Sequence, residues 1–230
     1  MDTLLLDPAR LDRPDTTVRL EPFPFLVAHG QLPGSARKDL ARDFPRYDEA
    51  GFFPWNPDDC GPTINKLIGD LSTPAVATAI GARLKIEHLG QYPTLVTLCR
   101  HLNKRHGTIH TDSKSKVATA LLYLNESWPD TSEGCLRFLH RIDDIDATVV
   151  PELKPLYGEF AVFKRCDNSF HGHLPYEGER RVIQVAWLIN EEAKARKTQR
   201  GKFSRWFKKL AGGLDKRFGA GRDRDASHRD

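Results

Sequence analysis

The sequence contains few cysteines and no long apolar segment. Its four cysteines, Cys60, Cys99, Cys135 and Cys166, are far apart, and no two of them form a C-x-x-C pair. This spacing argues against a zinc ribbon and against a disulfide framework, so we expect reduced thiols with mostly structural roles.

No apolar run reaches the roughly 18 residues that a membrane-spanning helix needs. The first residues place acids on both sides of three leucines and lack a basic segment, which disfavours a secretory signal. We therefore expect a cytoplasmic protein.

Positive charge is concentrated towards the C-terminus. The 230 residues have a formal net charge of +4, with 35 Lys/Arg and 31 Asp/Glu. Residues 194–230 hold 13 of the basic and 4 of the acidic residues, which leaves 22 and 27 in residues 1–193. The body is therefore mildly acidic. The length favours a single domain with appendages. We expect a loosely ordered N-terminal arm at 1–20, a domain at 21–193 and a basic tail at 194–230.

The tail has the pattern of an amphipathic helix. Its large apolar residues recur at helical spacing among Lys and Arg: Phe203, Trp206, Phe207, Leu210, Leu214 and Phe218. Residues 202–218 could therefore associate with an anionic membrane, which would place the protein peripherally at the inner membrane surface. The alternatives are docking onto the protein's own body or a partner, and a disordered tail. Nucleic-acid binding is disfavoured because no base-reading module accompanies the basic residues.

The rest of the chain changes from helical to strand patterns. Apolar spacing predicts a short helix over 33–45 and one or two helices over 63–86, broken near Pro74. Short runs typical of strands occupy 23–32, 94–102, 117–125, 135–139, 159–165, 169–175 and 180–190. Short strands at this spacing favour a sandwich or barrel over alternating βαβ units. We expect a mainly β protein (α+β) in which an N-terminal helical layer covers an antiparallel core.

Candidate metal ligands stand at the start of one strand and on a later one. In HTDSKSKVATALLYLN (110–125), His110 and Asp112 project from the same face if the chain is extended, so they can bind one ion. HxD alone also fits a surface turn. The segment SFHGHLP supplies His171 and His173 about sixty residues later. Two imidazoles and one carboxylate with open positions suit non-heme Fe(II).

One of two adjacent arginines is expected to point into the core. In RRVIQVAWLIN, alternation places Arg181 on the face that carries Ile183, Val185 and Trp187, and Arg180 on the other. The first face is the more apolar and is expected to line the core, so Arg181 would be a buried charge that needs an anionic partner. The carboxylate of a cosubstrate would provide one.

These motifs follow one another in an order that resembles a known family. They lie between about 92 and 190. In order, they are H-T-D, a strand ending in Y-L-N, a tryptophan and E-G-C-L, then P-L-Y-G-E-F-A-V-F, S-F-H-G-H-L-P and R-x-I-x-V-A-W. The order resembles the 2-oxoglutarate/Fe(II)-dependent dioxygenases, in particular the prolyl-hydroxylase-like branch. The resemblance implies a double-stranded β-helix (jelly-roll) core over 92–190. It also implies use of Fe(II), 2-oxoglutarate and O2, with ascorbate as a candidate reductant, and hydroxylation of an unactivated C–H bond with release of succinate and CO2.

The resemblance also assigns roles to individual residues. In that family the second histidine ligand stands four residues before a proline, which selects His171 over His173. The metal would be held by His110, Asp112 and His171, and His173 would lie beside it or face the substrate. The family's cosubstrate-binding basic residue stands six positions before a strand tryptophan, which again selects Arg181.

The chain departs from the family pattern at one cosubstrate contact. Related enzymes often carry a tyrosine about ten residues before the first ligand, where this chain has Arg100 and His101. The second anchor of 2-oxoglutarate is therefore open, with Tyr123 as a candidate. Arg100 and Lys114 are candidates for facing the substrate.

Two other functions are compatible with the same residues. A zinc hydrolase could use the triad with an activated water, although it would leave Arg181 without a role. A non-catalytic cupin-like module could bind a metal or a small acid. The substrate, whether small molecule, lipid, glycan or protein, depends on loops that the motifs do not describe.

Overall fold

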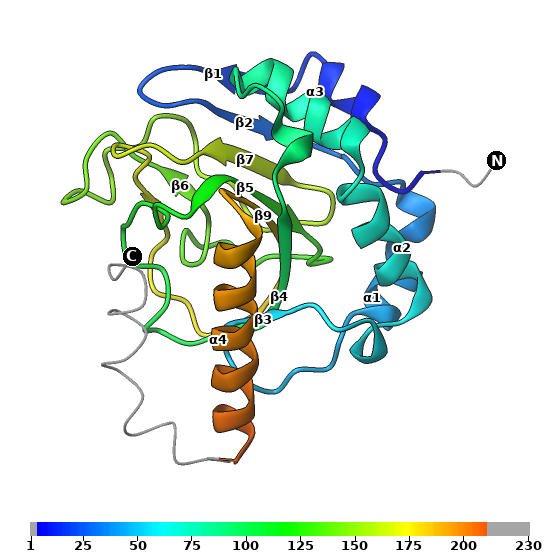
Figure 1. The fold of residues 1–230 in the computed structure, drawn as a ribbon. Helices are drawn as coiled ribbons and strands as arrows, with labels where there is room; N and C mark the ends of the chain where they lie inside the picture. Colours follow the sequence, from blue (N-terminus) through cyan, green and yellow to red (C-terminus); the bar gives the residue numbers. More distant parts are fainter. Residues whose placement is uncertain (1–3, 211–230) are drawn as a thin grey trace.

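A seven-stranded antiparallel sheet forms the centre of the molecule (Figure 1). The computed structural model describes residues 4–210. The strand order is β1-β2-β7-β5-β9-β4-β3. The strands are β1 (Thr17–Arg19), β2 (Phe25–Ala28), β3 (Phe52–Pro54), β4 (Thr94–Leu102), β5 (Lys116–Tyr123), β7 (Phe160–Lys164) and β9 (Gly178–Leu188). Because β5 and β9 lie in the middle, both of their faces must be covered by other parts of the chain.

A smaller second sheet covers part of one face. It pairs β6 (Arg137–Phe138) with β8 (His171–Gly172), and isolated bridges extend it, one of them between His110 and His171. Between the two sheets lies a cluster of buried residues that includes Tyr123, Phe163 and Val182. The fold class expected from the sequence, an antiparallel double-stranded β-helix with an N-terminal helical layer, is confirmed.

Three helices cover the other face of the large sheet. These are α1 (Arg37–Asp43), α2 (Pro62–Leu71) and α3 (Pro74–Leu84). The expected break is at Pro74, which begins α3, while the Thr73 side chain caps the new helix by accepting a hydrogen bond from the backbone N–H of Val76. Apolar side chains of α2 and α3 pack with Ile183 and Trp187 of β9 in the largest core cluster.

The N-terminal segment is part of the core rather than a loosely ordered arm. Leu6 and Leu11 are 2% and 3% exposed and belong to the core cluster beneath the helices. A short 3-10 helix (Pro8–Asp12) contacts α3, and β1 pairs with β2. The expectation of a loosely ordered arm at 1–20 was therefore wrong over the described residues. Two buried leucines are enough to anchor a short segment, and such a segment is too short to show a recognisable apolar periodicity.

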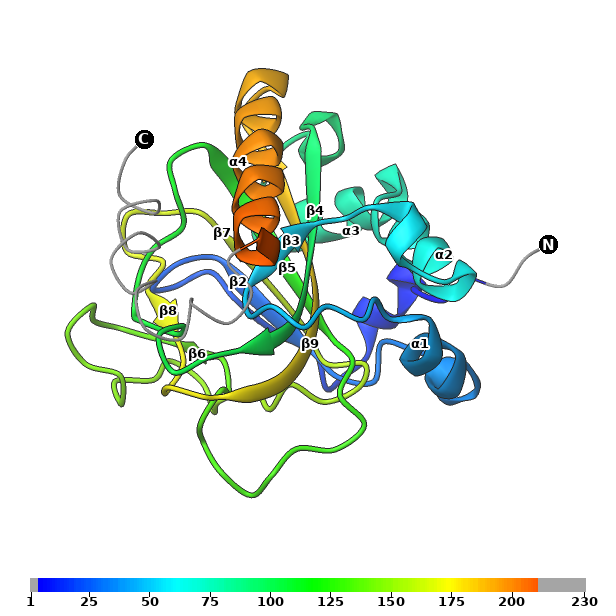
Figure 2. The same cartoon turned by 90° about the horizontal axis from the view of Figure 1, so that it is seen from below.

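The last helix, α4 (Glu191–Leu210), is continuous with the domain. Only two residues separate it from β9, and it lies against β3, β4 and β9 (Figure 2). Ala193 is completely buried with Ala186 and Leu188. Gly201 allows a close approach, because a Cβ there would lie 2.5 Å from Cγ of Pro54. The boundary expected at residue 193 therefore falls inside a docked element.

The apolar face expected from Phe203 onwards lies outside the residues whose side chains the structure describes. Membrane association through 202–218 stays a prediction. Across residues 4–210, no helix is both long enough and apolar enough to cross a bilayer.

Candidate metal centre

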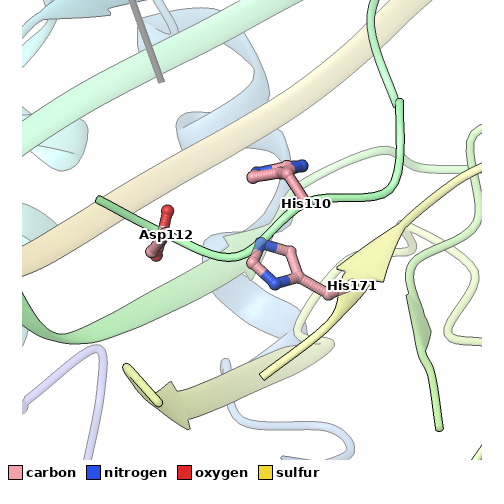
Figure 3. Close-up of side chains that lie close together, drawn as sticks. All are labelled: His110, Asp112 and His171. Atoms are coloured by element: carbon pink, nitrogen blue, oxygen red, sulfur yellow. The ribbon is translucent and has the colours of Figure 1, made fainter. Parts of the chain in front are cut away.

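Three potential metal ligands converge where the chain approaches β5 and meets β8. His110 and His171 are joined by two backbone hydrogen bonds of 3.0 Å, which place their side chains next to each other. Asp112 follows two residues after His110. One ligand atom from each of the three side chains lies within 4.8 Å of the others (Figure 3). The structure thus brings together the triad that the sequence indicated, and His173 is not part of it.

Both histidines are oriented by backbone carbonyl groups. Nδ1 of His110 lies 2.8 Å from the carbonyl oxygen of Thr108, and Nδ1 of His171 lies 2.9 Å from that of Ser169. A carbonyl oxygen only accepts hydrogen bonds, so each Nδ1 carries the proton and each Nε2 keeps its lone pair. This arrangement fixes the tautomer and the ring direction that metal binding by Nε2 requires.

The aspartate is held by two donors. Lys116 Nζ lies 2.7 Å from one carboxylate oxygen of Asp112, and the hydroxyl of Thr119 donates to the other. Burial on its own would raise the pKa of Asp112, but the Lys116 ammonium and the two nearby imidazoles hold that pKa well below its usual range. Burial, with His110 beside it, lowers the pKa of His171 to about 3. At neutral pH the site therefore offers an ionised carboxylate and a neutral imidazole, the forms that bind a metal. This donor set fits Fe(II).

His173 packs beside the triad. Its Nδ1 donates to the carbonyl of Leu174 at 2.8 Å, and its ring lies against Gly107, where the positive φ of 95° and the lack of space both require glycine. Burial, followed by the charge of Arg180, lowers the pKa of His173 to about 3. It is thus a neutral residue next to the site.

The arginine on the metal side of β9 is Arg180. Its side chain is buried between the sheets, where Nε donates to the carbonyl of Gly134 at 2.8 Å and Nη2 donates to the hydroxyl of Tyr123 at 3.2 Å. In the described part of the chain, no carboxylate lies within ion-pair distance of this guanidinium. Tyr123, the candidate second anchor, is fully buried beside it.

Arg181 and Arg100 lie on the opposite face of the sheet. Both pair with Glu179, at 2.8 and 3.0 Å. Alternation correctly grouped Arg181 with Ile183, but the face they share packs against the helices. The more apolar face lines the core, as expected, but the arginine that lies on the side of the triad is Arg180 on the other face. Both faces of a central strand are buried, and the site belongs to the face that also carries polar side chains such as Gln184.

One further expectation concerned a basic residue near the triad. Lys114, a candidate for facing the substrate, is exposed, whereas Lys116 contacts Asp112 directly. The contacts of Lys116 and Thr119 with the aspartate were not anticipated. Thr119 could have been found, because alternation along β5 puts it on the same face as Tyr123.

The chain is similar to known oxygenases over the region that holds this site. Residues 96–189 match the family model described as the 2OG-Fe(II) oxygenase superfamily. These residues belong to that superfamily. The match runs from β4 to β9 and includes the triad, Tyr123 and Arg180. The oxygenase domain is thus that of an oxidoreductase that uses Fe(II), 2-oxoglutarate and O2.

Solved structures share the fold at low sequence identity. A prolyl-4-hydroxylase from Pseudomonas putida is 18% identical with a TM-score of 0.51, and the match covers 72% of this chain and 92% of that one. A prolyl hydroxylase from Trichoplax adhaerens, solved with a peptide fragment of hypoxia inducible factor, is 17% identical with a TM-score of 0.50, over 74% and 86% of the two chains. No curated protein matches the sequence. These likenesses show the fold of the oxygenase domain and not its substrate.

Proposed function

We propose that this oxygenase hydroxylates an unactivated C–H bond, with Fe(II) held by His110, Asp112 and His171 and the distal carboxylate of 2-oxoglutarate held by Arg180 and Tyr123. The observation that carries the second assignment is the buried guanidinium of Arg180, which among the described residues has neutral hydrogen-bond partners but no anionic one. Burying a charge without a counter-ion is costly. A dicarboxylate that also reaches the metal would provide that counter-ion.

The protein's own contribution is orientation and protection. When bound, Fe(II) and 2-oxoglutarate supply an oxidative decarboxylation that consumes O2 and releases succinate and CO2. Lys116 and Thr119 hold the two oxygens of Asp112, so the carboxylate keeps one direction. The Thr108 and Ser169 carbonyls do the same for the two imidazoles.

Aromatic side chains keep water away from one side of the triad. The ring of Phe163 lies 4.3 Å from that of His171, and Phe138 lies 5.6 Å from Phe163. Both phenylalanines are almost completely buried. An apolar wall next to the reacting centre limits side reactions with solvent.

The experiment that tests this function separates metal binding, cosubstrate binding and turnover. Purified protein is loaded anaerobically with Fe(II) and 2-oxoglutarate, the visible metal-to-ligand charge-transfer band is recorded, and O2 is admitted before succinate is measured. We expect both signals, and we expect His110→Ala to lose them. Metal binding with neither band nor succinate would contradict the proposal and favour zinc hydrolysis or a metal-binding module.

A further inference from the structure

Two aromatic side chains stack on each other near the arginine that is proposed to bind 2-oxoglutarate. The ring centroids of Trp128 and Tyr176 are 4.5 Å apart, and the ring planes are tilted by 38°. Trp128 comes from the loop between β5 and β6, and Tyr176 from the segment between β8 and β9. We call these two residues the aromatic pair. Trp128 is half-buried but belongs to none of the core clusters that the described residues form, so its role is local.

The aromatic pair packs against Gly134. A Cβ at this position would lie 2.8 Å from Cζ2 of Trp128 and 3.0 Å from Cγ of Tyr176, so only glycine leaves room for both rings. The φ of 73° at Gly134 also favours glycine. The indole Nε1 of Trp128 donates to the carbonyl of the preceding residue, Glu133, at 3.2 Å. Trp128 therefore holds this stretch of backbone both by its ring and by its N–H.

The backbone of Gly134 supports the guanidinium of Arg180. Among residues 4–210, the Arg180 side chain has two hydrogen-bond partners, which are the carbonyl of Gly134 at 2.8 Å and the hydroxyl of Tyr123 at 3.2 Å. The N–H of Gly134 donates to the carbonyl of Leu174 at 3.1 Å, just beyond the strand that carries His171. Gly134 is thus held between the metal-binding strand and the arginine, and the aromatic pair covers its Cα.

Tyr176 also packs against the start of the strand that carries Arg180. A Cβ on Gly178, the first residue of β9, would lie 2.8 Å from the hydroxyl oxygen of Tyr176. One ring therefore lies against the residue two positions before Arg180 and against Gly134, which accepts from its Nε. A change in the position of this ring would affect both supports of the guanidinium.

We propose that the aromatic pair positions Arg180 for 2-oxoglutarate by holding the Gly134 carbonyl in place. The inference rests on the proposed function, because it takes Arg180 as the counter-ion of the cosubstrate. An arginine side chain has high rotamer entropy, and fixing it before the ligand arrives removes that cost from binding. Arg180 supplies the attraction for the carboxylate, and the aromatic pair fixes the direction of the guanidinium. Trp128 and Tyr176 are therefore positioning residues.

The test compares two tryptophans in similar surroundings. Trp128→Ala removes one ring of the aromatic pair. The matched control is Trp55→Ala, because Trp55 is also half-buried and its Nε1 also donates a hydrogen bond, to Asn65 at 3.0 Å. Trp55 packs against the core cluster beneath the helices. The Kd for 2-oxoglutarate is measured anaerobically with Fe(II) from the charge-transfer band, and kcat and KM are measured from succinate formation.

We expect Trp128→Ala to raise both Kd and KM for 2-oxoglutarate about tenfold, less than removal of the guanidinium in Arg180→Met. The kcat at saturating 2-oxoglutarate should stay within about twofold, because the lost interaction affects binding rather than chemistry. Trp55→Ala should leave Kd and KM unchanged. Tyr176→Phe keeps the ring and should resemble the natural protein, whereas Tyr176→Leu should resemble Trp128→Ala.

A double-mutant cycle shows whether the aromatic pair acts through Arg180. In that case Trp128→Ala adds little to the Kd of Arg180→Met, because the group that it positions is already absent. An unchanged Kd in Trp128→Ala, an equal rise in Trp55→Ala, or the full effect of Trp128→Ala in the Arg180→Met background would overturn the inference. Tyr176→Leu takes the place of Trp128→Ala if that variant does not fold. No charge-transfer band in the natural protein, or a Kd that Arg180→Met leaves unchanged, would instead refute the proposed function.

Discussion

Arg180 and Arg181 are adjacent in sequence but lie in different layers, and exchanging each for methionine distinguishes their roles. Arg180→Met removes the only charge that we assign to the distal carboxylate of 2-oxoglutarate and leaves Tyr123 as a neutral donor. Arg181→Met removes one of two arginines that share Glu179, a residue whose side chain is 38% exposed. The two variants have the same composition and net charge, so each is the control for the other.

The expected magnitudes differ because the two environments differ. A hydrogen bond to a charged group contributes about 2 kcal/mol, and each 1.4 kcal/mol is a factor of ten, so Arg180→Met should raise the KM for 2-oxoglutarate roughly 30-fold. Arg181→Met should leave this KM unchanged and cost about 0.5 kcal/mol of stability, as is typical of a partly exposed ion pair.

The assay is initial-rate formation of succinate over a range of 2-oxoglutarate concentrations, with the charge-transfer band as an independent measure of binding. A large rise in KM for Arg181→Met with none for Arg180→Met would show that the assignment from the structure is wrong. Equal effects of both changes would indicate a general loss of folding, which urea unfolding would reveal.

Three further predictions concern stability. Leu11→Ala should cost about 3 kcal/mol in urea unfolding, whereas Leu4→Ala, at a 44% exposed position, should cost little; equal costs would argue against an anchored N-terminus. Gly201→Val should lower the melting temperature by separating α4 from Pro54, and an unchanged temperature would contradict that contact. Metal-free protein should lose about 1.4 kcal/mol of stability per pH unit for each of His171 and His173 as the pH falls below about 6.5, because the unfolded chain protonates both imidazoles whereas in the folded protein each has a pKa of about 3. A flat profile between pH 6.5 and 4.5 would contradict this assignment.

The sequence predicted the parts of the site that depend on local spacing. His110 and Asp112 are two residues apart, and His171 lies in a distinctive motif, so their convergence could be inferred before the fold was known. Arg180 could not be found in this way, because hydrophobicity cannot distinguish the two faces of a strand that is buried on both sides. Only the packing of β9 against helices on one face and the small sheet on the other makes that distinction.

Other parts of the structure depend on contacts between distant segments. β8 spans two residues, too few for a periodic signal, although the surrounding motif was recognised. Leu6 and Leu11 became core residues only because α3 provides a surface for them. The docking of α4 likewise depends on Pro54, which lies in a segment that reads as a loop.

The alignment of β9 with its neighbours is controlled by residues other than its tandem arginines. A shift of one residue would still leave an arginine facing each layer, so the charge pattern alone would tolerate the error. The same shift would turn Trp187 towards the metal side and Gln184 towards the helices, where the amide would lose its partner Thr97. The strand can therefore occupy only one alignment at low energy. The strand that carries the proposed counter-ion of the cosubstrate thus also protects the sheet from misassembly.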